Sequence, residues 1–311
     1  MNQIRVITSS EQGFAVKGLR TSKAELLMVP ELGGRVISLR SLKAGREWLW
    51  HQPRPDWLWA NQPGDNFGLS PQAGIDECVP SVSSCQWKGR AIPDHGEVWF
   101  QAWTLDPEAL EAKVLKATVA LTVSPLVFSR AIRAAEDGSF IFDYSLENTG
   151  PEKEPYIWCF HPLKNIKPGD RLEFPPEVSS LRLNGGLGAP ISLGDVWAYP
   201  EPFPGIRLDE CITPGMPGEV CVKGFIAPLK EGWAALVNDG TGDRFEVRWD
   251  PLSVPYMGFW LNRGLATFHH VALEPATGIP DSLALAVEDW KQVQVVQPGE
   301  TVSWSLALQI S

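Results

Sequence analysis

Residues 116–148 read KATVALTVSPLVFSRAIRAAEDGSFIFDYSLEN and carry the clearest pattern of secondary structure in the chain. From Phe140 to Leu146, a large apolar side chain occupies every second position. This period of two is typical of a β-strand with one buried face, because successive side chains of a strand point to opposite faces. The pair Asp137-Gly138 just before it is a strong hairpin signal. We therefore predict a meander of three strands over residues 116–123, 126–134 and 140–147.

The rest of the chain has the same character. Short apolar runs are broken by Gly, Pro, Asn and Asp, as at residues 238–243, NDGTGD, which indicate a tight turn. No stretch of 12 or more residues has helical periodicity, and residues 107–115 are the best candidate for a short helix. The Gly- and Pro-rich residues 184–219 are expected to form a loop over the sheet. We predict an all-β fold with many strands, in a single domain over residues 1–311.

The overall charge limits the classes of partner. A formal net charge of -10 and a pI of about 5.1 argue against nucleic acid, because phosphate binding needs basic patches. No stretch approaches the roughly 18 apolar residues that a membrane span needs, and the first ten residues lack a secretory signal pattern. We expect a cytoplasmic protein without a membrane or nucleic-acid partner, as a monomer or weak homodimer.

The cysteines and histidines do not suggest a metal site. The five cysteines are odd in number and lack zinc-like spacing, so we expect reduced, buried thiols. His269 and His270 are adjacent, and on a strand they would point to opposite faces and not share one ion. We expect neither a metal nor a cofactor.

A second informative stretch delivers a histidine to the end of an aromatic run. Residues 158–170 read WCFHPLKNIKPGD, and Pro162 follows His161 directly. Proline cannot donate to a strand ladder, so it marks an edge, a bulge or the end of a strand. His161 is therefore expected to point out of a sheet, although a lone histidine there is more often an ordinary, half-buried one.

Five motifs in order resemble the aldose 1-epimerase (galactose mutarotase) family over nearly the whole chain. They are VPELGGRVISL (29–39), GIDECVPSV (74–82), PDHGEVW (93–99), WCFHPLKNIKPGD (158–170) and ALEPATGIPD (272–281). The resemblance implies a large antiparallel β-sandwich, the galactose mutarotase-like supersandwich, with the active cleft across one sheet.

The same resemblance implies roles for three residues in the interconversion of sugar anomers. Glu274 matches the general base, His161 the general acid, and His95 a second histidine that holds the sugar and polarises its hydroxyls. Glu274 lies between Leu273 and Pro275. Partial desolvation there would raise its pKa and make it a better base near neutrality.

Further residues are candidates for substrate binding. Asp76 or Glu77 would bind sugar hydroxyls, since the family's corresponding segment lies beside the sugar. Arg35 is either a solvated charge on a strand or a cleft residue. Sugars pack their C–H faces on aromatic rings, and among the 14 tryptophans we select Trp260 as such a ring.

Lys223 departs from the family pattern. The galactose-specific members have an aspartate where Lys223 stands before residues 225–229. A cation cannot accept hydrogen bonds from a sugar hydroxyl. It would favour a phosphorylated or carboxylated sugar, together with Arg35 or Lys164, or else it is simply a surface lysine.

Three classes of function compete. The first is a cofactor-independent mutarotase for an aldose or an aldose derivative, which requires His161 and Glu274 to face each other across a cleft. The second is a non-catalytic carbohydrate-binding protein on the same scaffold. The third, a polysaccharide lyase or hydrolase, is less favoured, because no carboxylate pair of a glycosidase is assignable from the sequence.

Overall fold

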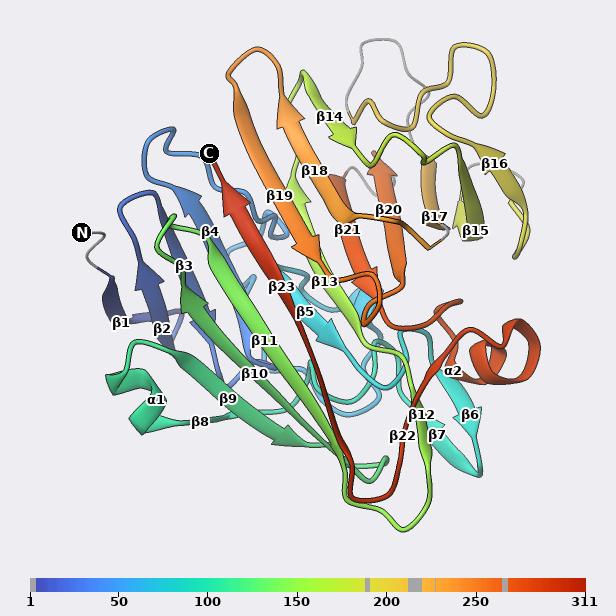
Figure 1. Cartoon of the computed structure of the whole chain (residues 1–311). Helices are drawn as coiled ribbons and strands as arrows, with labels where there is room; N and C mark the ends of the chain where they lie inside the picture. The colour runs from blue at the N-terminus through green and yellow to red at the C-terminus, as the bar shows by residue number, and fades with distance from the viewer. Residues whose placement is uncertain (1–3, 188–190, 212–219, 227, 265–267) are drawn as a thin grey trace.

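Two large antiparallel sheets lie face to face in the computed structural model and enclose the main hydrophobic core (Figure 1). The structure describes residues 4–187, 191–211, 220–226, 228–264 and 268–311. Within these residues, no helix has the length and apolar character needed to cross a membrane. The prediction of an all-β antiparallel sandwich is therefore confirmed.

One sheet has eleven strands. In their order across the sheet these are β1 (Arg5–Glu11), β2 (Phe14–Arg20), β3 (Ala24–Val29), β4 (Arg35–Ser41), β5 (Ile75–Cys78), β13 (Cys159–Asn165), β21 (His269–Ala276), β20 (Tyr256–Arg263), β17 (Val220–Ile226), β15 (Ser180–Leu187) and β16 (Val196–Ala198).

The other sheet has eight strands. In order these are β14 (Asp170–Glu173), β18 (Gly232–Asn238), β19 (Asp243–Trp249), β23 (Thr301–Ile310), β11 (Phe140–Asn148), β10 (Leu126–Ala134), β9 (Leu115–Ala120) and β8 (Thr104–Leu105). The smaller elements are the pairs β12 (Glu154–Tyr156) with β22 (Gln294–Val296) and β6 (Cys85–Trp87) with β7 (Arg90–Ile92), and the helical turns η1 (Phe67–Leu69), α1 (Pro107–Glu111), α2 (Leu283–Leu285) and η3 (Ala286–Trp290).

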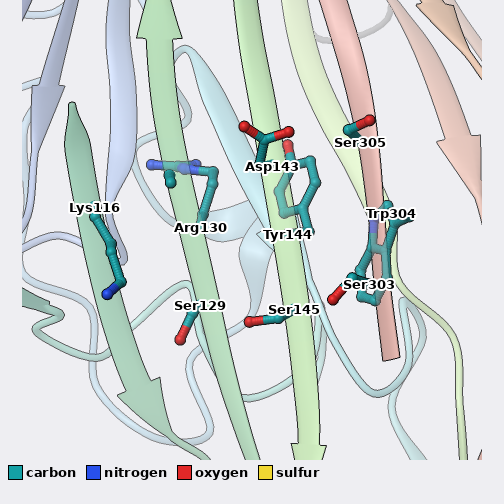
Figure 2. Close-up of a pocket in the computed structure, with 10 residues that line it drawn as sticks. Lys116, Ser129, Arg130, Asp143, Tyr144, Ser145, Ser303, Trp304 and Ser305 are labelled. Atoms are coloured by element: carbon teal, nitrogen blue, oxygen red, sulfur yellow. The ribbon is translucent and has the colours of Figure 1, made fainter. Parts of the chain in front are cut away.

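The predicted meander is present as β9, β10 and β11, and β10 pairs antiparallel with both neighbours. Successive residues of each strand point alternately into the space between the sheets and out to the outer face, as a period of two requires. The inward set includes Arg130 and Tyr144, both buried, and the buried Trp304 of the neighbouring β23 pairs with Tyr144. Figure 2 shows these strands with the more exposed residues of the outer face, where a hollow of about 450 Å³ is lined by Lys116, Ser129, Asp143, Ser145, Ser303 and Ser305.

Two other expectations have mixed outcomes. A short helix, α1, lies within residues 107–115, where Pro107 opens it and the Asp106 side chain accepts from the backbone N–H of Ala109. The stretch 184–219 is not all loop, because β15 extends to Leu187 and β16 adds an edge strand. Residues 188–190 and 212–219 of this stretch lie outside the described residues.

A buried ion pair connects the two sheets. Arg130 of β10 contacts Glu77 of β5 at 2.9 Å, and both side chains are almost fully buried. Glu77 also accepts from the Tyr144 hydroxyl at 3.0 Å and from Trp158 Nε1 at 2.9 Å. Because Arg130 and Tyr144 belong to the facing sheet, Glu77 points into the interior of the sandwich, and the adjacent Asp76 must point to the opposite side of β5.

The substitution Glu77→Gln should destabilise the fold by about 3–5 kcal/mol, because it leaves the buried Arg130 guanidinium without its counter-charge. Urea unfolding followed by circular dichroism measures the change. Glu147→Gln on the exposed face of β11 is the control and should change stability by less than about 0.5 kcal/mol. Equal stability of the two variants would contradict a structural role for the pair.

Lys164 also faces the interior of the sandwich. It is fully buried, its Nζ lies 4.7 Å from the centre of the Phe245 ring, and its hydrogen bond to the Pro162 carbonyl is long, at 3.4 Å. Burial lowers the pKa of Lys164 well below its ordinary value. The expectation that Lys164 helps to bind a substrate anion is therefore wrong, since the side chain points away from the outer face of its sheet.

The substitution Lys164→Met should stabilise the protein at neutral pH. Because the folded-state pKa of Lys164 lies well below its unfolded value, the unfolded chain binds more protons at this residue than the folded chain as the pH falls below about 10.4. Wild-type stability therefore rises with pH up to that value, and the variant loses this dependence. Thermal unfolding between pH 6 and pH 10 measures both effects. Lys167→Met, at an exposed position, is the control, and a less stable Lys164→Met would overturn the expectation.

Candidate active site

A cavity of about 530 Å³ lies on the outer face of the eleven-stranded sheet. Strands β13, β21, β20 and β17 supply its floor, and loops around Phe67 and His95 supply one wall. This volume is within the range of about 300–1,000 Å³ that is usual for small-molecule sites. The cavity has a charged end and an aromatic end.

The pairing of β13 with β21 brings the two expected catalytic residues together. Cys159 pairs with Ala276 and Leu163 with Ala272, so the same register sets His161 opposite Glu274. His161 Nε2 is 4.0 Å from Glu274 Oε1. The two side chains therefore face one another on the cavity floor, as the mutarotase hypothesis requires.

The two oxygens of the Glu274 carboxylate have different surroundings. Oε2 is bonded to Lys223 Nζ and accepts from Cys159 Sγ at 3.5 Å. Oε1 is buried and has no hydrogen-bond partner among the described residues. Burial favours a raised pKa, but attraction to the Lys223 ammonium group outweighs it, and the pKa of Glu274 lies below its ordinary value. The expectation of a raised pKa is wrong because the sequence did not reveal this cation.

Lys223 is not a surface lysine. Only 7% of it is exposed, and its Nζ contacts the carboxylates of Glu274 and, at 3.6 Å, Asp281. Burial disfavours the ammonium form, but attraction to Asp281 and Glu274 outweighs this and raises the pKa of Lys223 above its ordinary value. The expectation of a solvated side chain is wrong because two carboxylates hold the ammonium group at the cavity.

Asp281 is a functional candidate that we did not single out from the sequence. Its carboxylate accepts from Asn184 Nδ2 at 3.0 Å, and its backbone N–H donates to Asn184 Oδ1 at 3.2 Å. Its carbonyl accepts from the backbone N–H groups of Val82 and Ser83, both at 2.9 Å. Burial raises the pKa of Asp281. The feature of the sequence that could have identified Asp281 is its position as the last residue of the 272–281 motif.

His161 is held in an uncharged form by its surroundings. It is 6% exposed, and burial lowers its pKa to about 3. The His95 ring meets it edge to face at a centroid distance of 5.1 Å, and Phe67 lies 5.1 Å away. His161 Nδ1 has no hydrogen-bond partner among the described residues.

His95 is placed beside His161 by a strained turn. Its φ of 56° is left-handed, a conformation in which histidine is enriched among non-glycine residues. The Phe67 ring stacks on the imidazole at 3.9 Å, and Nδ1 lies 3.0 Å from Asp94 Oδ1. Burial would raise the pKa of Asp94, but hydrogen bonds from His95 and the Phe67 N–H lower it. The turn therefore orients the imidazole from both sides.

Arg35, Asp76 and Glu77 do not line the cavity. Arg35 Nε contacts Asp76 Oδ1 at 2.8 Å in a pair that is at most 1% exposed. Asp76 pairs with His161 across β5 and β13, so this ion pair lies beside the cavity floor. Arg35 as a solvated strand charge is therefore wrong, and Glu77 points into the sandwich. None of the three contacts the cavity space as a hydroxyl partner would.

The aromatic end is formed around His270. Trp260 lines the cavity and donates from Nε1 to His270 Nε2 at 3.1 Å, and the Trp50 ring stacks on His270 at 4.7 Å. Accepting this bond makes Nε2 the unprotonated nitrogen and leaves the proton on Nδ1. Burial lowers the pKa of His270 to about 4. Alternation along β21 predicted that His269 and His270 point to opposite faces of the strand. It did not predict that the His270 side chain lines the cavity.

The charged end has the components of proton transfer. A buried carboxylate oxygen without a partner lies beside a neutral imidazole, and both face the same cavity. Among the described residues, no group of three or more His, Cys, Asp or Glu side chains is arranged to hold a metal ion.

His161 and His270 should both remain neutral at pH 5, where an unfolded chain is mostly protonated at histidine. Between pH 6.5 and their folded pKa values the unfolded chain binds more protons, so the stability that these residues contribute is lost as the pH falls. Long-range ¹H–¹⁵N NMR of the imidazoles, assigned with His161→Asn and His270→Asn, measures both charge and tautomer. A charged His270 at pH 5 would contradict the assignment of its Nδ1–H tautomer.

The fold is similar to that of several solved structures. A galactose mutarotase-like protein from Clostridium acetobutylicum superposes with a TM-score of 0.68 at 13% identity, over 100% of this chain and 98% of that one. A galactose mutarotase related enzyme from Lactobacillus acidophilus gives 0.67 at 15% identity, over 99% and 97%. A galactose mutarotase-like protein from Lactobacillus casei gives 0.64 at 16% identity, over 99% and 100%.

Comparisons that use the sequence alone find no match. No protein-family model matches the chain, and no curated protein matches it. The structural likeness agrees with the resemblance of the five sequence motifs. The chain therefore has the galactose mutarotase-like β-sandwich fold.

Proposed function

We propose that this protein is a cofactor-independent mutarotase that interconverts the α and β anomers of an aldose or an aldose derivative. The observation that carries the proposal is the placement of His161 Nε2 4.0 Å from the unpartnered Oε1 of Glu274, on the floor of one cavity. The fold likeness supports the proposal only at the level of the scaffold.

The reaction needs two proton transfers at one ring. Glu274 Oε1 accepts the proton of the C1 hydroxyl while the C1–O5 bond breaks, and His161 donates a proton to O5. The C1–C2 bond then rotates, the ring recloses on the other face of the carbonyl, and both protons return to their residues. Because burial keeps His161 uncharged, its donor is a neutral imidazole N–H, and no net proton enters or leaves.

Other cavity residues would hold the sugar during ring opening. His95, oriented by Asp94 and Phe67, is placed to bind a hydroxyl near His161. Trp260 offers an aromatic surface for the C–H face of the sugar at the other end of the cavity. Asp281 and Asn184 add polar groups to the lining of the same cavity.

The substitutions Glu274→Gln and His161→Asn should each lower the acceleration of anomer exchange by about 10² to 10⁴, the usual contribution of a positioned proton-transfer group. NMR saturation transfer with glucose, galactose, xylose and glucose 6-phosphate measures exchange and identifies the preferred sugar. Glu11→Gln on the exposed edge strand β1 is the control and should behave as wild type. Circular dichroism verifies that each variant is folded.

One observation favours a second function, carbohydrate binding without catalysis. Lys223 holds the Glu274 carboxylate in its charged form and so weakens it as a base. The two functions differ in one result. A wild-type protein that binds a sugar but does not accelerate anomer exchange for any member of the panel is a binding protein, and the mutarotase proposal is then wrong.

A further inference from the structure

We propose that Lys223 is a positioning residue for Glu274: it binds Oε2 and leaves Oε1 alone to face His161 and the substrate. Lys223 then acts through the catalytic base and does not itself bind an anionic group of the sugar. This role rests on the function proposed above and assigns one residue's part in it.

The path from Lys223 to Glu274 crosses a whole strand. Lys223 is on β17 and Glu274 on β21, with β20 between them, so their strands are roughly 9.5 Å apart. Gly258 of β20 pairs directly with Glu274. A Cβ at Gly258 would lie 3.1 Å from Glu274 Oε2 and 3.0 Å from its Cβ. The glycine therefore leaves room for the carboxylate to lie over β20 and meet the ammonium group.

The ammonium group is fixed from its other side as well. Asp281 Oδ1 lies 3.6 Å from Lys223 Nζ, and Asn184 holds Asp281 through two hydrogen bonds. The Phe225 ring lies 5.5 Å from the same ammonium group. Lys223 is therefore confined between two carboxylates, and its side chain cannot move far without separating one of these pairs.

The charge balance leaves no cation for a substrate anion. Among the described residues that line the cavity, Lys223 is the only lysine or arginine, whereas Glu274 and Asp281 are two carboxylates. Its positive charge is already shared between them. A phosphate or carboxylate on the sugar would meet a buried site with excess negative charge, and its desolvation would not be compensated.

Removal of Lys223 should change the protonation of Glu274 in a defined direction. The groups that face Glu274 are Lys223 from β17, Asp281 from the loop after β21, His161 and Cys159 from β13, and Cys78 from β5; buried Lys164 acts more weakly from the other side of β13. Without Lys223, burial and the like charge of Asp281 both favour protonated Glu274. Proton uptake at Glu274 would then abolish its action as a base at a higher pH than in wild type.

The test is the pH profile of kcat/KM for anomer exchange in Lys223→Met, with Lys223→Arg as the variant that keeps the charge. We expect the acid limb of Lys223→Met to move up by about 1–3 pH units, the range for loss of a neighbouring opposite charge, and that of Lys223→Arg to stay near wild type. In the double variant Lys223→Met/Asp281→Asn the acid limb should return part of the way toward its wild-type position, because this variant also removes the like charge of Asp281. Circular dichroism and unfolding curves identify any variant that fails to fold.

A second readout does not depend on activity. A ¹³C NMR titration of the Glu274 carboxyl in Lys223→Met and wild type should show the same upward displacement of its midpoint. If wild type accelerates no sugar but this midpoint moves, the proposed function fails and the positioning of Glu274 by Lys223 stands. If the midpoint does not move, the positioning role is wrong.

Two kinetic results would also overturn the role of Lys223. An equal loss of kcat/KM at every pH would indicate a merely structural side chain. A wild-type preference for glucose 6-phosphate that Lys223→Met abolishes through KM would make Lys223 the receptor of a substrate anion, while mutarotation itself would remain supported.

Discussion

The register between β13 and β21 is the constraint on which the site depends. A slip of one residue would turn every side chain of a strand to the opposite face. In the observed register Phe160 and Leu273 are in the core, whereas His161 and Glu274 face the cavity. The hydrophobic core between the sheets therefore holds His161 and Glu274 in place, since the free energy lost by exposing that apolar face would exceed what a contact between these two side chains could contribute.

Buried charge is handled in two ways in this molecule. Inside the sandwich, the Glu77 carboxylate is satisfied by Arg130, Tyr144 and a tryptophan, and it has no contact with the cavity. At the cavity, Glu274 has one oxygen satisfied by Lys223 and the other unpartnered among the described residues. A fully bonded carboxylate stabilises a fold, whereas a half-bonded one retains the capacity to bind or to accept a proton.

The two ends of the cavity complement each other chemically. The charged end combines Glu274, Lys223 and Asp281 with a neutral His161, and the aromatic end combines Trp260 with a neutral His270 that Trp50 covers. A sugar has both hydroxyl groups and apolar C–H faces, so such a cavity can engage both kinds of surface. Burial keeps both imidazoles neutral, and the net charge of the cavity is therefore set by the two carboxylates and one ammonium group.

Patterns within short stretches of the sequence predicted strands of the sheets and the main chemical groups of the cavity. The alternation from Phe140 to Leu146 predicted β11 and its buried face, because a period of two acts within a few residues. His161 does point out of its sheet into the cavity, but the prediction that Pro162 marks an edge, a bulge or the end of a strand is wrong. Pro162 lies within β13, between β5 and β21. The motif that contains Glu274 likewise predicted a residue that the structure places in the cavity.

The side of the sheet that each charged residue faces, and the groups that it contacts, depend on how the strands pack in three dimensions. Asp76 and Glu77 are adjacent and must point to opposite faces, but the sequence did not say which one points inward. Lys223 and Glu274 are 51 residues apart, and their contact depends on the order of three strands and on Gly258 between them. The free energy of a buried charge is determined by such non-local neighbours, and therefore the pKa of Glu274 was predicted in the wrong direction from its flanking residues alone.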